Sequence, residues 1–317
     1  MKTYTYSLVL IFASHLTFSQ DVKKAIDYYQ NNQPSQAKQI LKFVEDDHSG
    51  YAESQFYLGR ICFDEEDLDQ AQDYFEEAIE IDENSSKYHL WLGNTIGSIA
   101  QESNFFKQGI LAPQIKNAYE RAVKLDPKNI DAQWGLVEYY TQAPGVMGGS
   151  WEKAEETARA IYKLDNVQGH NALATVYLRQ EKFTLAEKEY IKAAALDKNF
   201  IFTLGYFYQN QKTFNKAFDV FKKELEKDPD NKAALYQIGR TSALSGERSD
   251  LGIRSLNEYL NQPVNQGIPS HAAALMRKAM IYEKIGETDK AQTYYKESLA
   301  KDPKMTLAKD GLERVSK

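Results

Sequence analysis

The sequence predicts an all-α protein, a solenoid of about eight helical hairpins followed by a C-terminal capping helix. Of its 317 residues, 42% are hydrophobic and 12% aromatic, and only 8 are Pro. This composition suits packed helices far better than disorder. Small and aromatic residues also recur at helical spacing, and Asp-Pro pairs end several of the segments. Because each unit of a repeat array contacts only its neighbours, we expect one elongated domain over 20–317.

The stretch 52–84 shows the unit from which the rest of the chain is built. A first helix carries Leu58 and Gly59, and after an acidic turn a second helix carries Ala71 and Phe75. Small residues let two helices approach closely, while the large side chains fill the space between them. The pattern therefore predicts a helical hairpin.

This hairpin resembles the tetratricopeptide repeat, which has an aromatic, Leu-Gly, a Tyr, an Ala, a large aromatic, a second Ala and a closing Pro in about 34 residues. Here Gln55, Cys62 and Glu83 stand where the family has its first aromatic, its Tyr and its Pro. The resemblance implies a right-handed α-α superhelix that binds a protein or peptide in its concave groove. The stretch 143–149, Ala-Pro-Gly-Val-Met-Gly-Gly, resembles a loop of other bacterial repeat proteins of an exported type.

Residues 1–19 predict a secretory signal peptide, because Lys2 precedes an apolar core and small residues stand before a cut ahead of Gln20. The alternative is a frayed first helix. The apolar run is too short to span a bilayer. We therefore expect an exported protein, periplasmic or secreted, with no transmembrane segment in the mature chain.

The small residue that opens each second helix gives the register of the remaining hairpins. We expect repeats near 21–50, 52–85, 86–129, 130–166, 167–197, 198–231, 232–265 and 272–305, and a cap at 306–317. The residues that mark them are, in order, Ala37 and Leu41; Ala71 and Phe75; Leu92, Gly93 and Tyr119; Trp134 and Ala154; Leu173 and Ala186; Leu204, Gly205 and Phe221; Ile238, Gly239 and Leu256; and Ala279, Ala291 and Tyr295.

Two hairpins are longer than the others. The third carries about ten extra residues and the fourth about five, judged against the repeat length of about 34. Both insertions fall between the two helices of their hairpins. We therefore expect them to be neighbours on one edge of the array.

These insertions form the first candidate site. Two interpretations stay open: the aromatic insertion packs under the glycine loop, or the two insertions form a composite pocket for a peptide end or a small anionic ligand. The second follows from Gly148, Gly149 and Ser150, which would present free N–H groups where a helix starts at Trp151. The residues of this edge are Phe105, Phe106, Ile110 and Leu111 in the third hairpin and Val146, Met147, Gly148, Gly149 and Ser150 in the fourth.

The second candidate site is the concave groove, lined by first-helix positions outside the repeat signature. Aromatic rings interleaved with arginines and amides suit a protein partner, since rigid rings bury area and Arg offers forked donors. We expect Arg60, Arg179 and Arg240 to reach polar groups of an extended or helical partner segment. Alternatively, packing between repeats uses several of the rings. The groove residues are Phe56, Arg60, Phe63, Asn94, Trp134, Glu138, Arg179, Phe202, Tyr206, Tyr236 and Arg240.

Other function classes find little support. A net charge of −6 argues against a nucleic-acid surface, and the single cysteine excludes an internal disulfide framework. The acidic run at 64–69 lacks the glycine of a calcium loop, and no two-histidine zinc helix or phosphate loop occurs. We therefore predict a scaffold that is no enzyme and holds no metal or cofactor. By analogy, it acts in cell-envelope assembly or maintenance; the alternative is a small-ligand-binding protein or enzyme that uses the composite pocket. The oligomeric state stays open.

Cleavage of the signal peptide is directly testable. We expect the exported protein to begin at Gln20, because small residues precede that position. N-terminal sequencing of the protein recovered from envelope and culture fractions checks this. Recovery of a chain that still begins at Met1 would contradict it.

Overall fold

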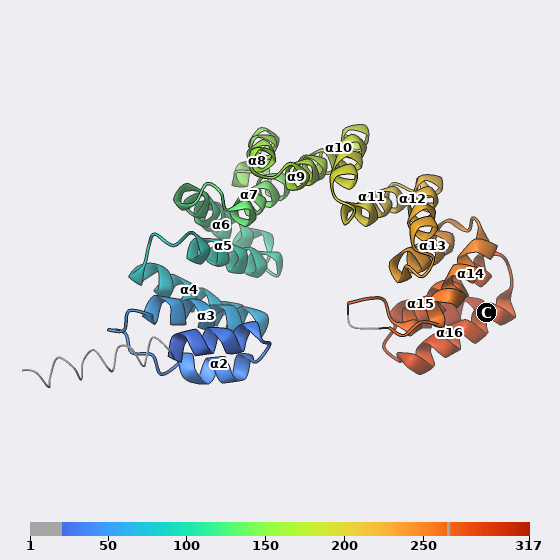
Figure 1. Cartoon of the computed structure of the whole chain (residues 1–317), viewed down its shortest axis with the longest axis horizontal. Coiled ribbons are helices and arrows are strands. Elements are labelled where there is room, and N and C mark those ends of the chain that lie inside the picture. The colour runs from blue at the N-terminus through green and yellow to red at the C-terminus, as the bar shows by residue number, and fades with distance from the viewer. Residues whose placement is uncertain (1–20, 265–266) are drawn as a thin grey trace, which may run out of the picture. The chain divides into compact units, whose positions relative to one another are not determined.

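The structure, a computed structural model, describes residues 21–264 and 267–317. The predicted signal peptide lies outside these residues. Within them the chain is helical, with short turns, one 3-10 segment and no strand (Figure 1). The prediction of an all-α solenoid of hairpins is therefore confirmed. The chain divides after Ala186 into two compact units, although the sequence predicted one elongated domain. A repeat array can divide in this way without a linker, because each hairpin contacts only its neighbours.

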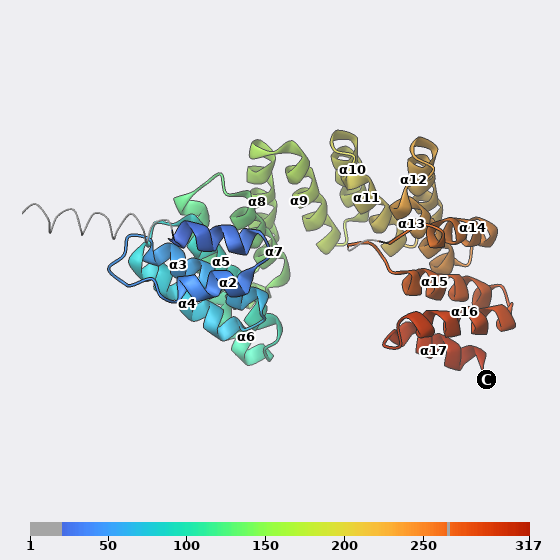
Figure 2. The same cartoon turned by 60° about the horizontal axis from the view of Figure 1, so that its bottom comes forward.

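The first unit is a stack of antiparallel helices, each packed on the next (Figure 2). First helices also contact one another across the stack, α3 with α5, α5 with α7 and α7 with α9, so they form one continuous layer. A helical segment at 21–30 comes first. The helices that follow are α2 (Pro34–Leu41), α3 (Tyr51–Asp64), α4 (Leu68–Ile81), α5 (Ser86–Gln101), α6 (Phe105–Leu125), α7 (Ile130–Gln142), the 3-10 helix η1 (Gly145–Met147), α8 (Trp151–Leu164) and α9 (Asn166–Arg179); the division falls within α10 (Phe183–Leu196).

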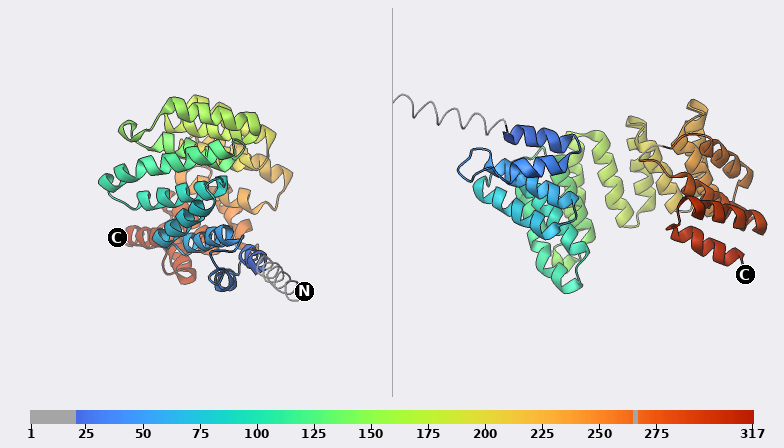
Figure 3. Two further views of the ribbon diagram at one scale, coloured as in Figure 1. Left: turned by 90° about the vertical axis from the view of Figure 1, so that its left-hand side faces the viewer. Right: turned by 90° about the horizontal axis from the view of Figure 1, so that it is seen from below.

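The second unit repeats this arrangement and ends in a shorter helix, as Figure 3 also shows. Its first helices α13 and α15 contact each other, and α15 contacts the final helix α17. Its helices after α10 are α11 (Phe200–Asn210), α12 (Phe214–Lys227), α13 (Lys232–Ser245), α14 (Ser249–Leu260), α15 (His271–Lys284), α16 (Thr288–Lys301) and α17 (Thr306–Val315).

Glycines of the first helices receive the large side chains of the second helices. A methyl group added at Gly59 would lie 2.8 Å from a ring carbon of Phe75, and one at Gly205 would lie 2.3 Å from a ring carbon of Phe221. Both rings are fully buried. Interiors packed at this density leave no room for an extra carbon. The helices of these hairpins are therefore as close as glycine allows.

The two insertions take different forms. In the third hairpin the extra residues lengthen the helices: α6 has 21 residues and contains Pro113. In the fourth hairpin they form the connection 143–150, which contains η1. η1 contacts α6, so the two insertions lie side by side.

We expect Gly135→Ala to destabilise the first unit by about 1–3 kcal/mol, because its methyl group would lie 2.4 Å from Tyr119 Cε1 and force that buried ring to move. Urea unfolding followed by circular dichroism measures the change. Gly145→Ala is the control, since no atom lies within 4 Å of its added carbon. Equal stability of the two variants would contradict the packing described here.

Candidate functional site

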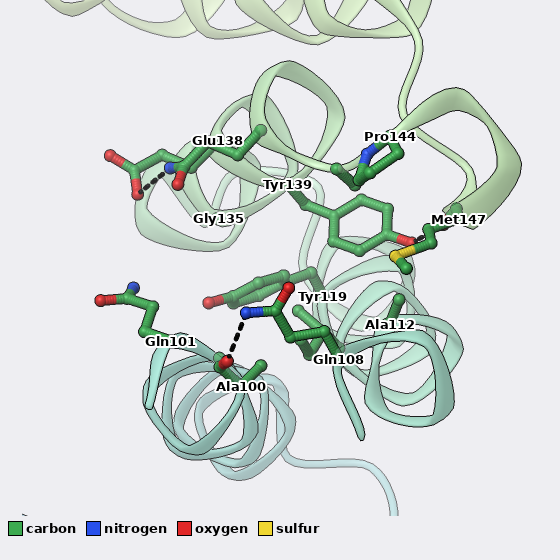
Figure 4. A pocket seen from close by; sticks show the side chains of 14 residues that line it. Ala100, Gln101, Gln108, Ala112, Tyr119, Gly135, Glu138, Tyr139, Pro144 and Met147 are labelled. Atoms are coloured by element: carbon green, nitrogen blue, oxygen red, sulfur yellow. Dashed lines mark hydrogen bonds between the residues drawn. The ribbon is translucent and has the colours of Figure 1, made fainter. Parts of the chain in front are cut away.

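A pocket of about 210 Å³ lies between α5, α6 and α7, beside the connection that follows α7. Its walls combine apolar side chains with amides and two tyrosines (Figure 4). The lining residues are Gly97, Ala100, Gln101, Gln108, Ala112, Ile115, Tyr119, Gly135, Glu138, Tyr139, Gln142, Ala143, Pro144 and Met147. Both insertions contribute to it, but of the nine residues predicted for this edge only Met147 lines the pocket.

Two buried tyrosines shape the interior of the pocket. Tyr119 donates its hydroxyl to Asn94 Oδ1 at 2.9 Å, and Tyr139 donates to the carbonyl oxygen of Met147. Gln108 donates from Nε2 to the carbonyl oxygens of Ala100 and Ser103, at 3.1 and 3.0 Å. Figure 4 shows the amide oxygen of Gln108 directed into the pocket. These hydrogen bonds fix the walls and leave that oxygen as an acceptor.

The mouth of the pocket is polar and carries one negative charge. Gln101, Glu138 and Gln142 are exposed, and Gln142 Nε2 lies 3.4 Å from Glu138 Oε2. Burial, and then the nearby carboxylate of Glu138, raise the pKa of Tyr119 above its ordinary value. The phenol therefore stays neutral. The pocket suits a neutral or cationic group with an apolar stem and disfavours an anion.

The prediction that Gly148, Gly149 and Ser150 present free N–H groups is wrong. Their amides donate to the carbonyl oxygens of Gly145, Pro144 and Tyr140, at 3.0, 3.1 and 3.0 Å. Ser150 does cap α8, since its side chain accepts from the amide of Lys153. Because the loop folds back on α7, its donors are used within the protein, and no anion site is formed by them.

The glycines of this loop serve its tight path. Gly148 has a φ of 95°, a conformation that favours glycine. A carbon added at Gly149 would lie 1.8 Å from the carbonyl oxygen of Ala143, so only glycine fits there. Met147 packs toward Gly109 of α6, at 3.5 Å from the position of an added carbon. The loop is thus shaped to close one end of the pocket.

The aromatic insertion does not pack under this loop. Phe105 and Phe106 are 67% and 80% exposed, and Ile110 and Val146 are also exposed. Leu111 alone of the four apolar residues predicted in the third hairpin is buried. The exposed residues Phe105, Phe106, Ile110 and Val146 form an apolar edge outside the pocket.

The predicted groove residues of the first unit divide into buried and accessible ones. Phe56 is buried between neighbouring repeats, with ring centroids 5.8 Å from Phe75 and 5.1 Å from Tyr88, so it is unavailable to a partner. Trp134 is half-buried against the core, and Asn94 is held by Tyr119. Glu138 and Arg179 are exposed.

Arg60 and Phe63 converge on Trp91, which was not among the predicted residues. The guanidinium carbon of Arg60 lies 3.5 Å from the centroid of a Trp91 ring, and the Phe63 ring meets it edge-on at 5.3 Å. Such a cation-π contact holds the arginine in place. The signal that could have found Trp91 is its position directly before Leu92-Gly93 on the first helix.

In the second unit Tyr236 is buried, with its ring centroid 5.5 Å from that of Tyr259, and is likewise unavailable to a partner. Phe202 is half-buried and stacks on Phe221 at 5.9 Å, and Tyr206 is 38% exposed. Arg240 donates to Gln209. The predicted groove ended at the seventh hairpin and therefore missed Arg277 of α15.

The described residues show no other centre for chemistry. They contain no group of three or more His, Cys, Asp or Glu side chains that could hold a metal ion. Cys62 is buried, and burial raises the pKa of its thiol. Within the same residues, no helix has both the length and the apolar character needed to cross a membrane.

Comparisons with known proteins identify the repeat. Two family models, each described as tetratricopeptide repeat, match residues 7–84 and 272–304. A tetratricopeptide repeat protein of Parabacteroides merdae is 11% identical, with a TM-score of 0.52 over 95% of this chain and all of the other. A thermophilic one of Thermus thermophilus is 13% identical, with a TM-score of 0.48 over 60% and 98%. YrrB, described as having an unusual peptide-binding site, is 16% identical, with a TM-score of 0.37 over 75% and 97%. The Parabacteroides structure supports the fold, and the family models identify tetratricopeptide repeats in those two stretches.

We expect Tyr139→Phe to loosen the loop 143–150, because the carbonyl oxygen of Met147 loses its donor. The free energy of local opening should fall by about 1–2 kcal/mol. Hydrogen exchange at the amides of Gly149 and Ser150 measures it. The control is Tyr162→Phe, which removes the same hydroxyl from α8, outside the loop. Unchanged exchange in Tyr139→Phe would show that this bond does not hold the loop.

Proposed function

We propose that this chain, which is built of tetratricopeptide repeats in their solenoid fold, is a scaffold that binds a segment of a partner protein along its first-helix layer. One observation carries the proposal: the pocket of the first unit opens within this layer. Its polar mouth is formed by side chains of α5 and α7, which are adjacent first helices. A segment lying across α5 and α7 would therefore pass over the pocket and could insert one side chain.

The size and chemistry of the pocket support an inserted side chain. Its volume of about 210 Å³ lies below the range of about 300–1,000 Å³ typical of sites for free small molecules. Tyr119 and Tyr139 supply rigid aromatic walls, as in pockets that take an anchoring residue of a partner. With the carboxylate of Glu138 at the mouth, the best occupant is a long side chain with an apolar stem and a neutral or cationic end.

The alternative of an enzyme in this pocket lacks a supporting observation. Glu138 is the one carboxylate that lines it, and it is exposed to solvent. Burial raises the pKa values of both Tyr119 and Tyr139. A raised pKa keeps each phenol protonated near neutral pH, so neither is available as a general base and both suit recognition better than proton transfer.

Export is part of the same proposal. The charge and apolar pattern of residues 1–19 supports a signal peptide, which would deliver the scaffold to the periplasm or the exterior. There a binding module of this kind would serve assembly or maintenance of the cell envelope.

A pocket-filling variant tests the proposal. Gly97 lines the pocket, and a carbon added there meets nothing closer than the Tyr119 hydroxyl at 3.9 Å. Gly97→Leu should therefore fill the pocket and keep the fold. With a photocrosslinker at Gln101, we expect the mature protein to capture one partner from envelope fractions, and Gly97→Leu to lower that capture about tenfold or more.

The control is Ala300→Leu, which adds the same side chain at an exposed position of α16. It should capture the partner as the wild type does, and circular dichroism should show both variants folded. Equal capture by wild type and Gly97→Leu would exclude the pocket as the docking point. If the wild type captures no partner at Gln101, the scaffold proposal itself fails.

A further inference from the structure

Two arginines of the second unit lie on neighbouring first helices without an acidic partner. Arg240 belongs to α13 and Arg277 to α15, and these helices contact each other. Neither arginine makes an ion pair with any described residue. Both are half-buried, so water solvates their charges only in part and does not fully replace an acidic partner.

The other arginines of this unit are satisfied. Arg314 forms two hydrogen bonds with the carboxylate of Glu283, at 2.8 and 3.1 Å. Arg248 donates to Asn215 at 2.9 Å and lies 3.8 Å from Asp219. Arg254 is exposed and is solvated on the surface of α14. The half-buried pair therefore stands apart from its neighbours.

Neutral groups hold the pair in position and leave most of its donors unused. Arg240 donates from Nη1 to Gln209, whose own amide donates to Thr241 at 2.8 Å. Gln209 and Thr241 are buried, so this arrangement is fixed within the core. Arg277 donates from Nη1 to the sulfur of Met280 at 3.4 Å, a weak acceptor, and its buried Nε has no hydrogen-bond partner in the protein. Buried donors without an acceptor are rare in proteins, and here one lies beside a second cation.

The positive charges of Arg240 and Arg277 repel each other. Burial, and then the charge of Arg277, lower the pKa of Arg240. Two half-buried charges of one sign cost free energy in the unbound protein. Residues that weaken the free protein in this way mark sites where a ligand supplies the missing interaction.

We propose that Arg240 and Arg277 together bind a carboxylate side chain of an acidic segment of the partner protein. A guanidinium presents forked donors that match the two oxygens of a carboxylate, and its hydrogen bonds to charged acceptors are the stronger ones. The ring of Tyr206 is 38% exposed, and Gln237 of α13 donates to its hydroxyl at 3.4 Å. It offers the segment an apolar contact beside the charges.

A protein segment fits this face better than a free anion. The arginines lie on first helices of the second unit, the same kind of helix that borders the pocket in the first unit, and this inference rests on the proposed function. A chain of net charge −6 would repel an acidic partner over most of its surface. An unpaired cationic pair would therefore fix where, and in which register, an acidic segment docks.

Fluorescence anisotropy with a labelled ten-residue peptide rich in Glu tests the proposal on the mature protein. We expect Arg240→Gln and Arg277→Gln each to weaken binding about tenfold or more. Arg254→Gln, which removes the same charge from an exposed site of the same unit, should change it less than about twofold. A peptide with Gln in place of every Glu should bind the wild type about tenfold more weakly or worse.

The outcomes separate this inference from the proposed function. If the Gln peptide binds as well as the Glu peptide, the acidic preference is wrong although a protein-binding role stands. Binding that persists in both arginine variants, or its absence in the wild type, overturns the assignment of the two arginines. If inorganic phosphate displaces the peptide at concentrations near the peptide's own Kd, the pair takes a free anion and not a protein segment.

Stability gives a second readout. Because the pair is repulsive in the free protein, Arg277→Met should keep or raise the unfolding temperature while it weakens peptide binding. A fall in unfolding temperature as large as that of a core truncation would instead assign Arg277 a structural role and overturn the proposal.

Discussion

Contact between a large side chain of one helix and a glycine of the next sets the spacing within both units. The same arrangement recurs at Gly59 with Phe75, Gly93 with Tyr119, Gly205 with Phe221, Gly239 with Leu256 and Gly311 with Tyr295. In each case an added carbon would come within 2.8 Å of the partner side chain. Close approach of the hairpin helices brings neighbouring first helices into contact within each unit. The pocket of the first unit and the arginine pair of the second both lie on such neighbouring first helices.

The first helices of the two units carry different kinds of surface. In the first unit, α5 and α7 border a pocket with amides and one carboxylate at its mouth. In the second unit, α13 and α15 carry two arginines that make no ion pair with any acidic group of the described residues. The mouth of the pocket and the pair of arginines thus carry opposite charges. A partner that used both would need a cationic or neutral anchor in one segment and an acidic residue in another.

The hairpins could be predicted from sequence because their signal is local: Leu58, Gly59 and Phe75 pack within one hairpin. The burial of Phe56 and Tyr236 could not be predicted in this way, because it depends on how neighbouring repeats pack. The same holds for the loop amides. Ser150 donates to the carbonyl oxygen of Tyr140, ten positions back, and neither glycine spacing nor helix capping reveals that bond. The insertions could be predicted by counting residues against the repeat length. The exposed position of Phe105 could not be predicted, since hydrophobicity alone favours burial.

Tyr119 belongs both to the packing of the hairpins and to the wall of the pocket. Its ring lies against Gly93 of α5 and Gly135 of α7, and the same ring faces the space that a partner side chain would enter. Occupancy and folding are therefore thermodynamically linked at this residue. A partner bound to the native state at about one hundred times its Kd would add about 2.7 kcal/mol to the free energy of unfolding. The resistance of this unit to proteolysis would then report how much of the scaffold is engaged.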